Sequence, residues 1–442
     1  MLIQRNWITS LNTTQYINIT FLVVSIIQFN IFGYVGLAGY GLLIVFGAAV
    51  FIVNRHRMKF ATGTAFKIAI AYYAYFLIAA LINGSYKMIE ASLLTMLLLT
   101  LAGFVLRSNE EIDDNLISLA KILTIAGIVM CVLSFAVACF TYLFPEVVNS
   151  MPDWLSTKLI DIKGDFPRRM SGFVLNANST SEYSYMTACL SFYLLTKIKS
   201  RKWKTLAITN ILISLFTVFF LTATRTVMIS IFAFYGTYYI CQVIHLLSLR
   251  KTESIQSRLI SLIIVPVLLI TILSILFAYQ PIKDFIFKHI IRISSLATGS
   301  GRLSLYSEIL DIGKANRIVG VSIDTVKAET TIHAQHCHNH FLETLTFGGV
   351  PTLLLFSAYI LITFIVAFKA VWKTKSLQYH QRANLLLFTG IIVSQFFYGL
   401  TECDIDKTSI SSFVYALSLA SLHTVSRNHN DKEKSKSNKA SS

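Results

Sequence analysis

Long runs of apolar residues, separated by short polar segments, form the dominant pattern along the chain. A helix of about 20 mostly apolar residues is long enough to cross the ~30 Å hydrocarbon layer of a membrane. Counting such runs predicts twelve spanning helices, at about residues 16–32, 34–53, 68–84, 91–106, 118–143, 180–196, 205–223, 227–248, 259–279, 348–368, 384–402 and 408–425. The pattern therefore predicts an all-α fold, a polytopic bundle of membrane helices.

The composition of the 442 residues agrees with this prediction. Hydrophobic residues make up 55% of the chain and charged residues only 14%. A soluble domain has about 45–50% apolar and about 25% charged residues. So large an apolar excess excludes a set of ordinary soluble domains.

Lysine and arginine predict the orientation of the spans, because short loops rich in these residues stay on the cytoplasmic side. With both termini in the cytoplasm, the inner segments hold 24 of the 38 basic residues. Of the remainder, eleven lie in two long outer loops at about 144–179 and 280–347. The excess of basic residues behind the net charge of +16 is thus explained by the orientation of the loops, and we expect no nucleic-acid partner.

The chain is expected to form one transmembrane domain over residues 1–426, in which the two outer loops build the active region. The larger loop falls between the ninth and tenth spans. Residues 427–442 are polar, basic and low in complexity, which predicts a disordered cytoplasmic tail. No repeat of fixed period is evident, so a transporter built from inverted repeats is not favoured.

Arginines near the outer surface are the first candidates for chemistry, since an ionisable residue at membrane depth suggests function. Arg225 stands between the seventh and eighth spans with almost no loop. It could serve a site, or it could extend into the headgroups as a surface residue. In the preceding outer loop, Arg168 and Arg169 come before Asn176 and Asn178. These arginines either contact phosphate or are ordinary surface charge, and the asparagines could cap a helix or line a cavity.

The second outer loop contains two predicted helices. The first has an apolar stripe that suits a helix lying in the membrane interface; its residues are Ile282, Phe285, Ile286, Ile290, Ile293 and Leu296. Gly299 and Gly301 then interrupt the chain, and a second helix is expected to begin near Arg302. Because a helix N-terminus exposes backbone N–H groups, Arg302 could complete an anion site there, or it could simply be solvated.

The same loop ends in four histidines within eight residues, beside Cys337: His333, His336, His338 and His340. Imidazole and thiolate groups bind zinc, but this spacing matches no standard zinc site. A histidine could instead remove a proton from a hydroxyl group as a general base. A solvated polar loop is the third interpretation, and we expect neither a metal nor a cofactor.

In their order along the chain, these signals resemble the O-antigen ligase and polysaccharide polymerase family. The matching segments are Thr224-Arg225-Thr226, Gly301-Arg302-Leu303, His338-Asn339 and Gly349-Val350-Pro351. The segment from Arg169 to Asn178 is also similar to the family's stretch before the central spans. Two departures stand out, Thr352 in place of a glycine and Gly320-Val321-Ser322 in place of Gly-x-Gly. Neither removes a charged or proton-transferring group.

The resemblance implies a metal-independent, inverting glycosyltransferase of the bacterial inner membrane, with its active site on the outer face. Its donor would be a glycan carried on undecaprenyl diphosphate, and its catalytic residues would be His338, Arg225 and Arg302. We expect Arg168, Arg169, Asn178, Asn339 and His340 to bind substrate. The remaining partners implied are a glycan or lipid acceptor, membrane lipids, and the flippase and chain-length regulator of the same pathway.

The expected activity is polymerisation of lipid-linked repeat units into a surface polysaccharide of the cell envelope, such as a capsule. One alternative is a ligase that transfers the finished glycan to lipid A core or to a protein. A transporter of lipid-linked sugars and a non-catalytic assembly subunit are the alternatives outside this reaction class.

Overall fold

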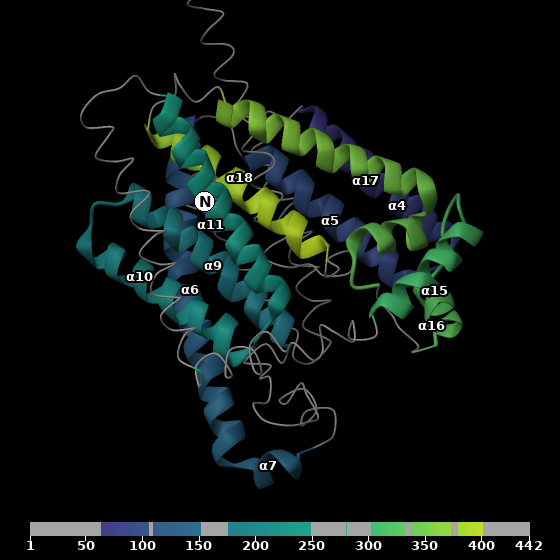
Figure 1. Ribbon diagram of the computed structural model, residues 1–442, viewed down its shortest axis with the longest axis horizontal. Helices are drawn as coiled ribbons and strands as arrows, with labels where there is room; N and C mark the ends of the chain where they lie inside the picture. Colours follow the sequence, from purple (N-terminus) through teal and green to yellow (C-terminus); the bar gives the residue numbers. More distant parts are fainter. Residues whose placement is uncertain are drawn as a thin grey trace, which may run out of the picture.

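The computed structural model describes residues 63–105, 109–151, 176–248, 280, 302–331, 337–372 and 379–400. Every regular element in these ranges is a helix (Figure 1). The predicted all-α class is therefore confirmed for the described part of the chain. The predicted spans at 16–32, 34–53, 259–279 and 408–425, the interfacial stripe at 282–296 and the tail lie outside the described residues.

Eight of the twelve predicted spans coincide with helices in the described part of the chain. These helices are α4 (Thr64–Ile82), α5 (Tyr86–Val105), α6 (Asn109–Leu143), α9 (Ala177–Lys197), α10 (Arg201–Phe216) with the π-helix η1 (Thr217–Leu221), α11 (Arg225–Ser248), α17 (His340–Trp372) and α18 (Tyr379–Gly399). The shorter helices are α7 (Pro145–Asn149), α15 (Arg302–Ala315) and α16 (Ile323–Glu329).

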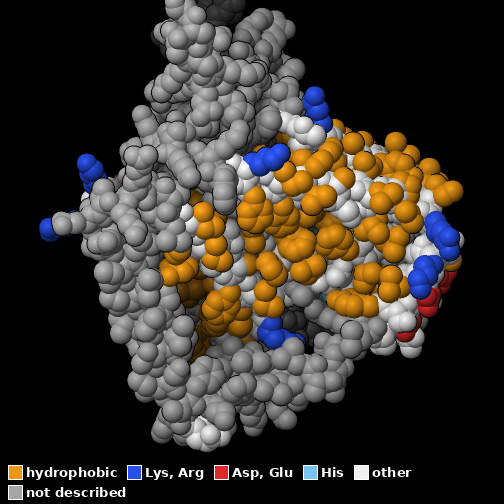
Figure 2. Space-filling view, turned by 45° about the horizontal axis from the view of Figure 1, so that its top comes forward, with side chains coloured by type: hydrophobic (Ala, Val, Ile, Leu, Met, Phe, Trp, Pro, Cys, Tyr) orange, Lys and Arg blue, Asp and Glu red, His pale blue; other side chains and the backbone are white. Residues whose placement is uncertain are grey.

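Five segments within the described ranges are long and apolar enough to cross a membrane: Thr64–Ile82, Leu116–Leu143, Arg201–Leu221, Arg225–Ile244 and His340–Lys369. In Figure 2, hydrophobic side chains cover much of the described part of the surface, and lysine and arginine side chains lie mainly at the margins of this apolar area. A surface of this kind suits contact with lipid chains, with the cations at headgroup level. The protein is a multi-pass membrane protein.

Helix α18 is the central element and runs between two groups of helices (Figure 1). On one side, the Tyr193 hydroxyl of α9 donates to Asn384 Oδ1 at 2.7 Å, and the Tyr185 hydroxyl donates to Ser394. On the other side, its last turn meets the beginning of α17. Residues 383–392 of α18 are buried on every face of the helix, as expected of a helix that is surrounded by protein.

Helices α6, α9 and α10 approach closely because the residues between them are small or carry hydroxyl groups. Thr124 and Ser191 lie 2.8 Å apart through their hydroxyl oxygens, and the Asn210 amide donates to the Ser191 hydroxyl at 2.8 Å. Small residues and hydrogen bonds of this kind hold helices together in lipid, where the hydrophobic effect gives no preference for protein over lipid.

Helices α15 and α16 pack against the ends of α4 and α5. Phe76 and Met88 share a buried apolar cluster with Ile309 and Val326. The Asn83 side chain, at the end of α4, donates to the Val319 carbonyl at 2.8 Å. The described part of the segment between the predicted ninth and tenth spans is therefore a folded layer on one end of the bundle.

Two helix starts differ from the predicted spans. Helix α6 begins at Asn109 rather than near 118, because a helix can continue beyond the apolar stretch that marks the membrane. Helix α17 begins at His340 rather than near 348.

Gly349 breaks α17 with a φ of 73°. A Cβ atom at Gly349 would lie 2.4 Å from the Ile318 carbonyl oxygen, so both the conformation and the space require glycine. Pro351 then falls in the first turn of the second segment, where proline is tolerated.

Gly127 offers a test of the close packing of α6. A Cβ atom there would lie 2.4 Å from Asn210 Oδ1 and 2.5 Å from Thr187 Oγ1. We expect Gly127→Ala to destabilise the protein by about 1–3 kcal/mol through overpacking. Thermal unfolding of the purified protein in detergent would measure the loss.

Gly236→Ala on α11 is the matched control, because a Cβ atom at Gly236 meets nothing within 4 Å. Its melting temperature should equal or slightly exceed that of the wild type, since alanine favours a helix. Equal melting temperatures for the Gly127 and Gly236 variants would contradict this account of the packing.

Candidate functional site

Arg225 is held at a tight junction between two spans. It begins α11, and only Thr222, Ala223 and Thr224 separate it from η1. The Ser181 hydroxyl of α9 donates to Thr224 Oγ1 at 2.7 Å and lies 2.5 Å from Thr222 Oγ1. These buried hydroxyls fix the turn, so the start of α11 has a defined position. The connection at Arg225 is thus only three residues long.

The N-terminus of α9 lies beside the same junction. Asn176 caps α9 by accepting a hydrogen bond from the Ser179 N–H at 3.1 Å, one of the two uses expected for it. The Thr224 hydroxyl approaches the Ala177 carbonyl oxygen at 3.4 Å. Two helix N-termini, which carry partial positive charge, are therefore close to Arg225. Asn178 is half-buried in the first turn of α9. Arg168 and Arg169 lie outside the described residues.

His338 lies in a turn that is held from two directions. Its carbonyl oxygen accepts a hydrogen bond from the Tyr306 hydroxyl of α15 at 3.1 Å. The next residue, Asn339, caps α17 by accepting from the Leu342 N–H at 3.1 Å, and its amide donates to the Leu400 carbonyl at 2.9 Å. The His338 side chain is half-buried. The turn is thus fixed between α15 and the end of α18.

Both turns contain a non-glycine residue in the left-handed region. Ala223 has a φ of 46° and His338 a φ of 50°, and they are the two such residues in the described ranges. Conformations of this kind are uncommon outside glycine and cluster at functional sites, where the surrounding contacts maintain them. The strain therefore coincides with the two motifs that the sequence singled out.

The two turns lie at the same end of the bundle. Helices α9 and α18 run antiparallel, because Tyr193 pairs with Asn384 and Tyr185 pairs with Ser394. At a rise of 1.5 Å per residue, α9 begins about 12 Å beyond Tyr185, and Leu400 lies about 9 Å beyond Ser394 in the same direction. The Arg225 junction contacts the N-terminus of α9, and the His338 turn is bonded to Leu400 through Asn339.

Arg302 is the first residue of α15, where the sequence predicted a helix to begin. Tyr306, which contacts the His338 carbonyl, lies one helical turn further along. Four residues of helix correspond to about 6 Å along the axis. The N-terminus of α15 is therefore near the His338 turn.

His340 is part of the helix packing. Its Nε2 atom lies 3.5 Å from the Tyr72 hydroxyl, and its ring centroid lies 4.6 Å from that of Phe356. It is buried against α4 and against a later turn of its own helix, α17. These contacts and the capping by Asn339 give the two residues structural roles, and their expected part in substrate binding stays a prediction.

Glu343 is a buried residue of this region that the sequence did not reveal. Its side chain is 1% exposed, and its Oε1 atom accepts a hydrogen bond from the Cys337 N–H at 3.1 Å. The carboxylate thus ties the first turn of α17 to the residue before His338. An acidic residue in the first turn of a helix is common. The one signal in the sequence is that Glu343 follows the helix cap Asn339 by four residues.

Cys337 is buried beside this carboxylate. Burial raises the pKa of its thiol well above the usual value, and the charge of Glu343 acts in the same direction. The thiol therefore stays neutral, whereas a zinc ligand must be a thiolate. Within the described ranges, no three His, Cys, Asp or Glu residues are grouped so as to hold a metal ion. His333 and His336 lie outside those ranges.

In a comparison with known families, residues 210–357 match the O-antigen ligase family. This segment contains Arg225, Arg302 and His338, and it runs from α10 into α17. The match supports the family resemblance that the motifs in this segment indicated, and with it a role of the glycan ligase or polymerase type. No curated protein matches the chain.

Glu343→Ala tests how the His338 turn is held. Removing the carboxylate leaves the buried Cys337 N–H without its acceptor, at a cost of about 1–3 kcal/mol. We expect backbone amides of residues 337–340 to exchange with deuterium about tenfold faster, as a local loss of 1.4 kcal/mol implies. Hydrogen–deuterium exchange with mass spectrometry would measure the rates.

Two further variants serve as controls for this measurement. Glu343→Gln keeps a carbonyl oxygen as acceptor and should restore most of the protection. Glu329→Ala removes an exposed carboxylate at the end of α16 and should leave the exchange unchanged. Unaltered exchange in Glu343→Ala would show that this hydrogen bond does not hold the turn.

Proposed function

We propose that the protein is a glycosyltransferase that polymerises oligosaccharide units carried on undecaprenyl diphosphate at the outer face of the bacterial inner membrane. The main support is the placement of the Arg225 junction and the His338 turn at one end of the bundle, within a segment that matches the O-antigen ligase family. The polymer would be a capsular or other surface polysaccharide. No cofactor takes part in the proposed reaction.

Arg225 and Arg302 would bind the diphosphate of the donor. Each begins a helix, α11 and α15, so the side-chain charge adds to the partial positive charge of the helix N-terminus. Charge-assisted hydrogen bonds of this type contribute roughly 1.5–3 kcal/mol each. Negative charge grows on the diphosphate as the sugar–phosphate bond breaks, so the same contacts stabilise the transition state more than the ground state.

His338 would act as the general base. The hydroxyl oxygen of the acceptor sugar attacks the anomeric carbon of the donor, and the bond from that carbon to the phosphate oxygen breaks. The acceptor proton passes to His338, and the carrier lipid leaves as the diphosphate. A single displacement inverts the anomeric configuration. Such proton transfer contributes about 10²–10⁴-fold to a rate.

The remaining expected site residues would orient the substrates. Asn178 lies in the first turn of α9 beside the Arg225 junction, where an amide could contact the glycan. Arg168 and Arg169 precede α9 in the chain and would add positive charge for the diphosphate. Asn339 and His340 would act mainly by holding the His338 turn. The flippase and the chain-length regulator of the pathway would be the protein partners.

The proposed orientation places the opposite end of the bundle in the cytoplasm, together with both termini. Lys121 lies over the ring of Trp203 at 5.3 Å from its centroid, beside the basic start of α10. Tryptophan and lysine gather at membrane interfaces, and lysine is enriched on the cytoplasmic side. The end that carries Arg225 and His338 would then face outward.

A ligase of the same fold is the second candidate function, because the match is to the O-antigen ligase family. It would use the same donor and the same three residues and would differ in its acceptor, lipid A core or a protein. A transporter of lipid-linked sugars would instead need charged residues along a path through the membrane, whereas the candidate residues here gather at one end.

Substitution of the three residues tests the mechanism. We expect His338→Ala to lower glycan transfer about 10²–10⁴-fold. Arg225→Ala and Arg302→Ala should each lower it roughly 10–150-fold, as the loss of 1.5–3 kcal/mol implies. Transfer would be measured with purified protein and a lipid-linked oligosaccharide donor.

Arg201→Ala is the control for charge, because Arg201 is exposed at the start of α10, at the opposite end of the bundle. It should retain full transfer. Full product length and amount from all three site variants, at normal membrane levels, would overturn the mechanism.

The acceptor can be identified with the same purified protein. Incubation with lipid-linked repeat units alone should give a ladder of products on the carrier lipid if the protein is a polymerase. If product forms only after lipid A core or an acceptor protein is added, the protein is a ligase. The reaction should continue in the presence of a chelator, and inhibition by the chelator would contradict a metal-independent mechanism.

A further inference from the structure

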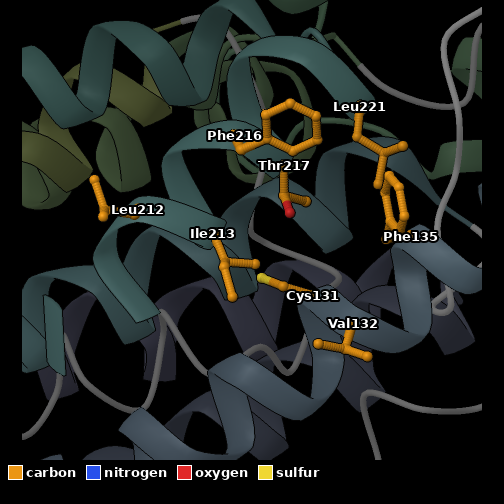
Figure 3. Close-up of a pocket in the computed structure, with 8 residues that line it drawn as sticks. All are labelled: Cys131, Val132, Phe135, Leu212, Ile213, Phe216, Thr217 and Leu221. Carbon is orange, nitrogen blue, oxygen red and sulfur yellow. The ribbon is translucent and has the colours of Figure 1, made fainter. Parts of the chain in front are cut away.

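A groove of about 440 Å³ lies between α6 and the α10–η1 segment (Figure 3). Side chains from both helices form its walls: Cys131, Val132 and Phe135 from α6, and Leu212, Phe216 and Leu221 from the other side. The volume is within the range of small-ligand pockets, about 300–1,000 Å³. The space is therefore large enough for part of a chain molecule.

The lining of the groove is almost entirely apolar. Cys131 Sγ lies 3.5 Å from the Ser184 hydroxyl of α9, and the Thr217 side chain is buried. Val132 and Leu212, by contrast, are 52% and 62% exposed. The groove thus opens at the surface of the bundle, on two helices that are apolar enough to span the membrane. A groove of this kind suits an apolar molecule that enters from the lipid phase.

One of the residues that line the groove is close to Arg225 in the chain. Leu221 lines it and ends η1, and Arg225 follows four residues later. An extended chain of four residues spans at most about 14 Å. The π-helix η1 ends at Leu221, and π-helical turns are frequent at functional sites. A cation therefore stands near one end of an apolar groove.

We propose that this groove holds the first isoprene units of the donor's polyprenyl chain while the diphosphate lies at Arg225. This inference rests on the proposed function and adds a second part to its site. A molecule with an anionic head and an apolar tail matches a cation followed by an apolar groove. With the orientation proposed above, the groove falls in the outer half of α6 and α10, where the tail of an outward-facing donor lies.

The groove sets the position of the donor more than its affinity. Lipid tails are as apolar as the side chains of the groove, so moving the tail from bilayer to protein gains little from the hydrophobic effect. Contact with a shaped surface instead fixes the direction in which the tail leaves the diphosphate. Filling the groove should therefore impair donors with a long chain and spare donors without one.

Val132→Trp and Leu212→Trp fill the groove from opposite walls, so that one variant remains if the other fails to fold. We expect each to raise KM for the polyprenyl-linked donor roughly tenfold, as steric exclusion from an apolar pocket does. KM for a donor with a single isoprene unit, and kcat for both donors, should stay unchanged. Ile240→Trp on α11 is the matched control, because Ile240 is 57% exposed and lies outside the groove.

A binding experiment that needs no glycan transfer complements the kinetics. The probe is a polyisoprenyl diphosphate with a diazirine in an isoprene unit near the diphosphate, photolysed with the full-length protein in nanodiscs. We expect crosslinks to residues 131–135 and 212–221, decreased by Val132→Trp and retained in Ile240→Trp. A phospholipid with a diazirine in its acyl chain is the comparison probe.

The outcomes separate this inference from the proposed function. An unchanged KM in both groove variants would overturn the inference. So would labelling of the groove by the phospholipid probe to the same extent, if polyprenyl diphosphate does not displace that probe. In either case, transfer activity would still uphold the proposed function. Specific labelling by the polyprenyl probe in a protein without any glycan transfer would uphold the groove and overturn the function.

Discussion

The lipid layer requires every backbone N–H and C=O group within it to be paired inside the protein, and this constraint decides where chemistry can occur. Helices satisfy the requirement along their length, so unpaired backbone groups and irregular turns remain only at their ends. Both candidate turns lie at such ends, one at the start of α11 and one before α17. In both, side chains from other helices hold a residue in a left-handed conformation. The site is therefore assembled from helix termini, and the bundle serves to bring those termini to one level.

Helix α18 is the part of the bundle that relates the two turns to each other. Its side chains bond to α9 on one face, and the carbonyl of Leu400 at its end accepts from Asn339. Gly390 lies against the Phe234 ring of α11, so α11 can come close to it. A shift of α18 would consequently move the His338 turn relative to Arg225. The buried tyrosine, serine and asparagine bonds between α9 and α18 oppose such a shift, because unpaired polar groups are unfavourable in the interior of a bundle.

Much of this arrangement could be predicted from the sequence, because hydropathy marks a spanning helix within a few residues and a glycine or arginine marks its end. The position of Arg225 and the helix start at Arg302 followed from such local patterns. The extent of α6 and the early start of α17 did not, because hydropathy records the thickness of the membrane rather than the length of a helix. The burial of Glu343 and the bond from Asn339 to Leu400 depend on contacts between distant parts of the chain. Such contacts leave no periodic signal in a single sequence.

The hydrogen bond between Asn339 and Leu400 also has a consequence for biosynthesis. The two residues are 61 positions apart, and α17 and α18 lie between them in the chain. During translation, Arg225, Arg302 and His338 are all made well before the residue that completes the His338 turn. The nascent protein would thus be inserted in the membrane with its reactive groups present but not yet in position. The protein would become active only when the penultimate predicted span, α18, has packed into the bundle. A truncated or prematurely released chain would therefore not react with the lipid-linked oligosaccharides around it.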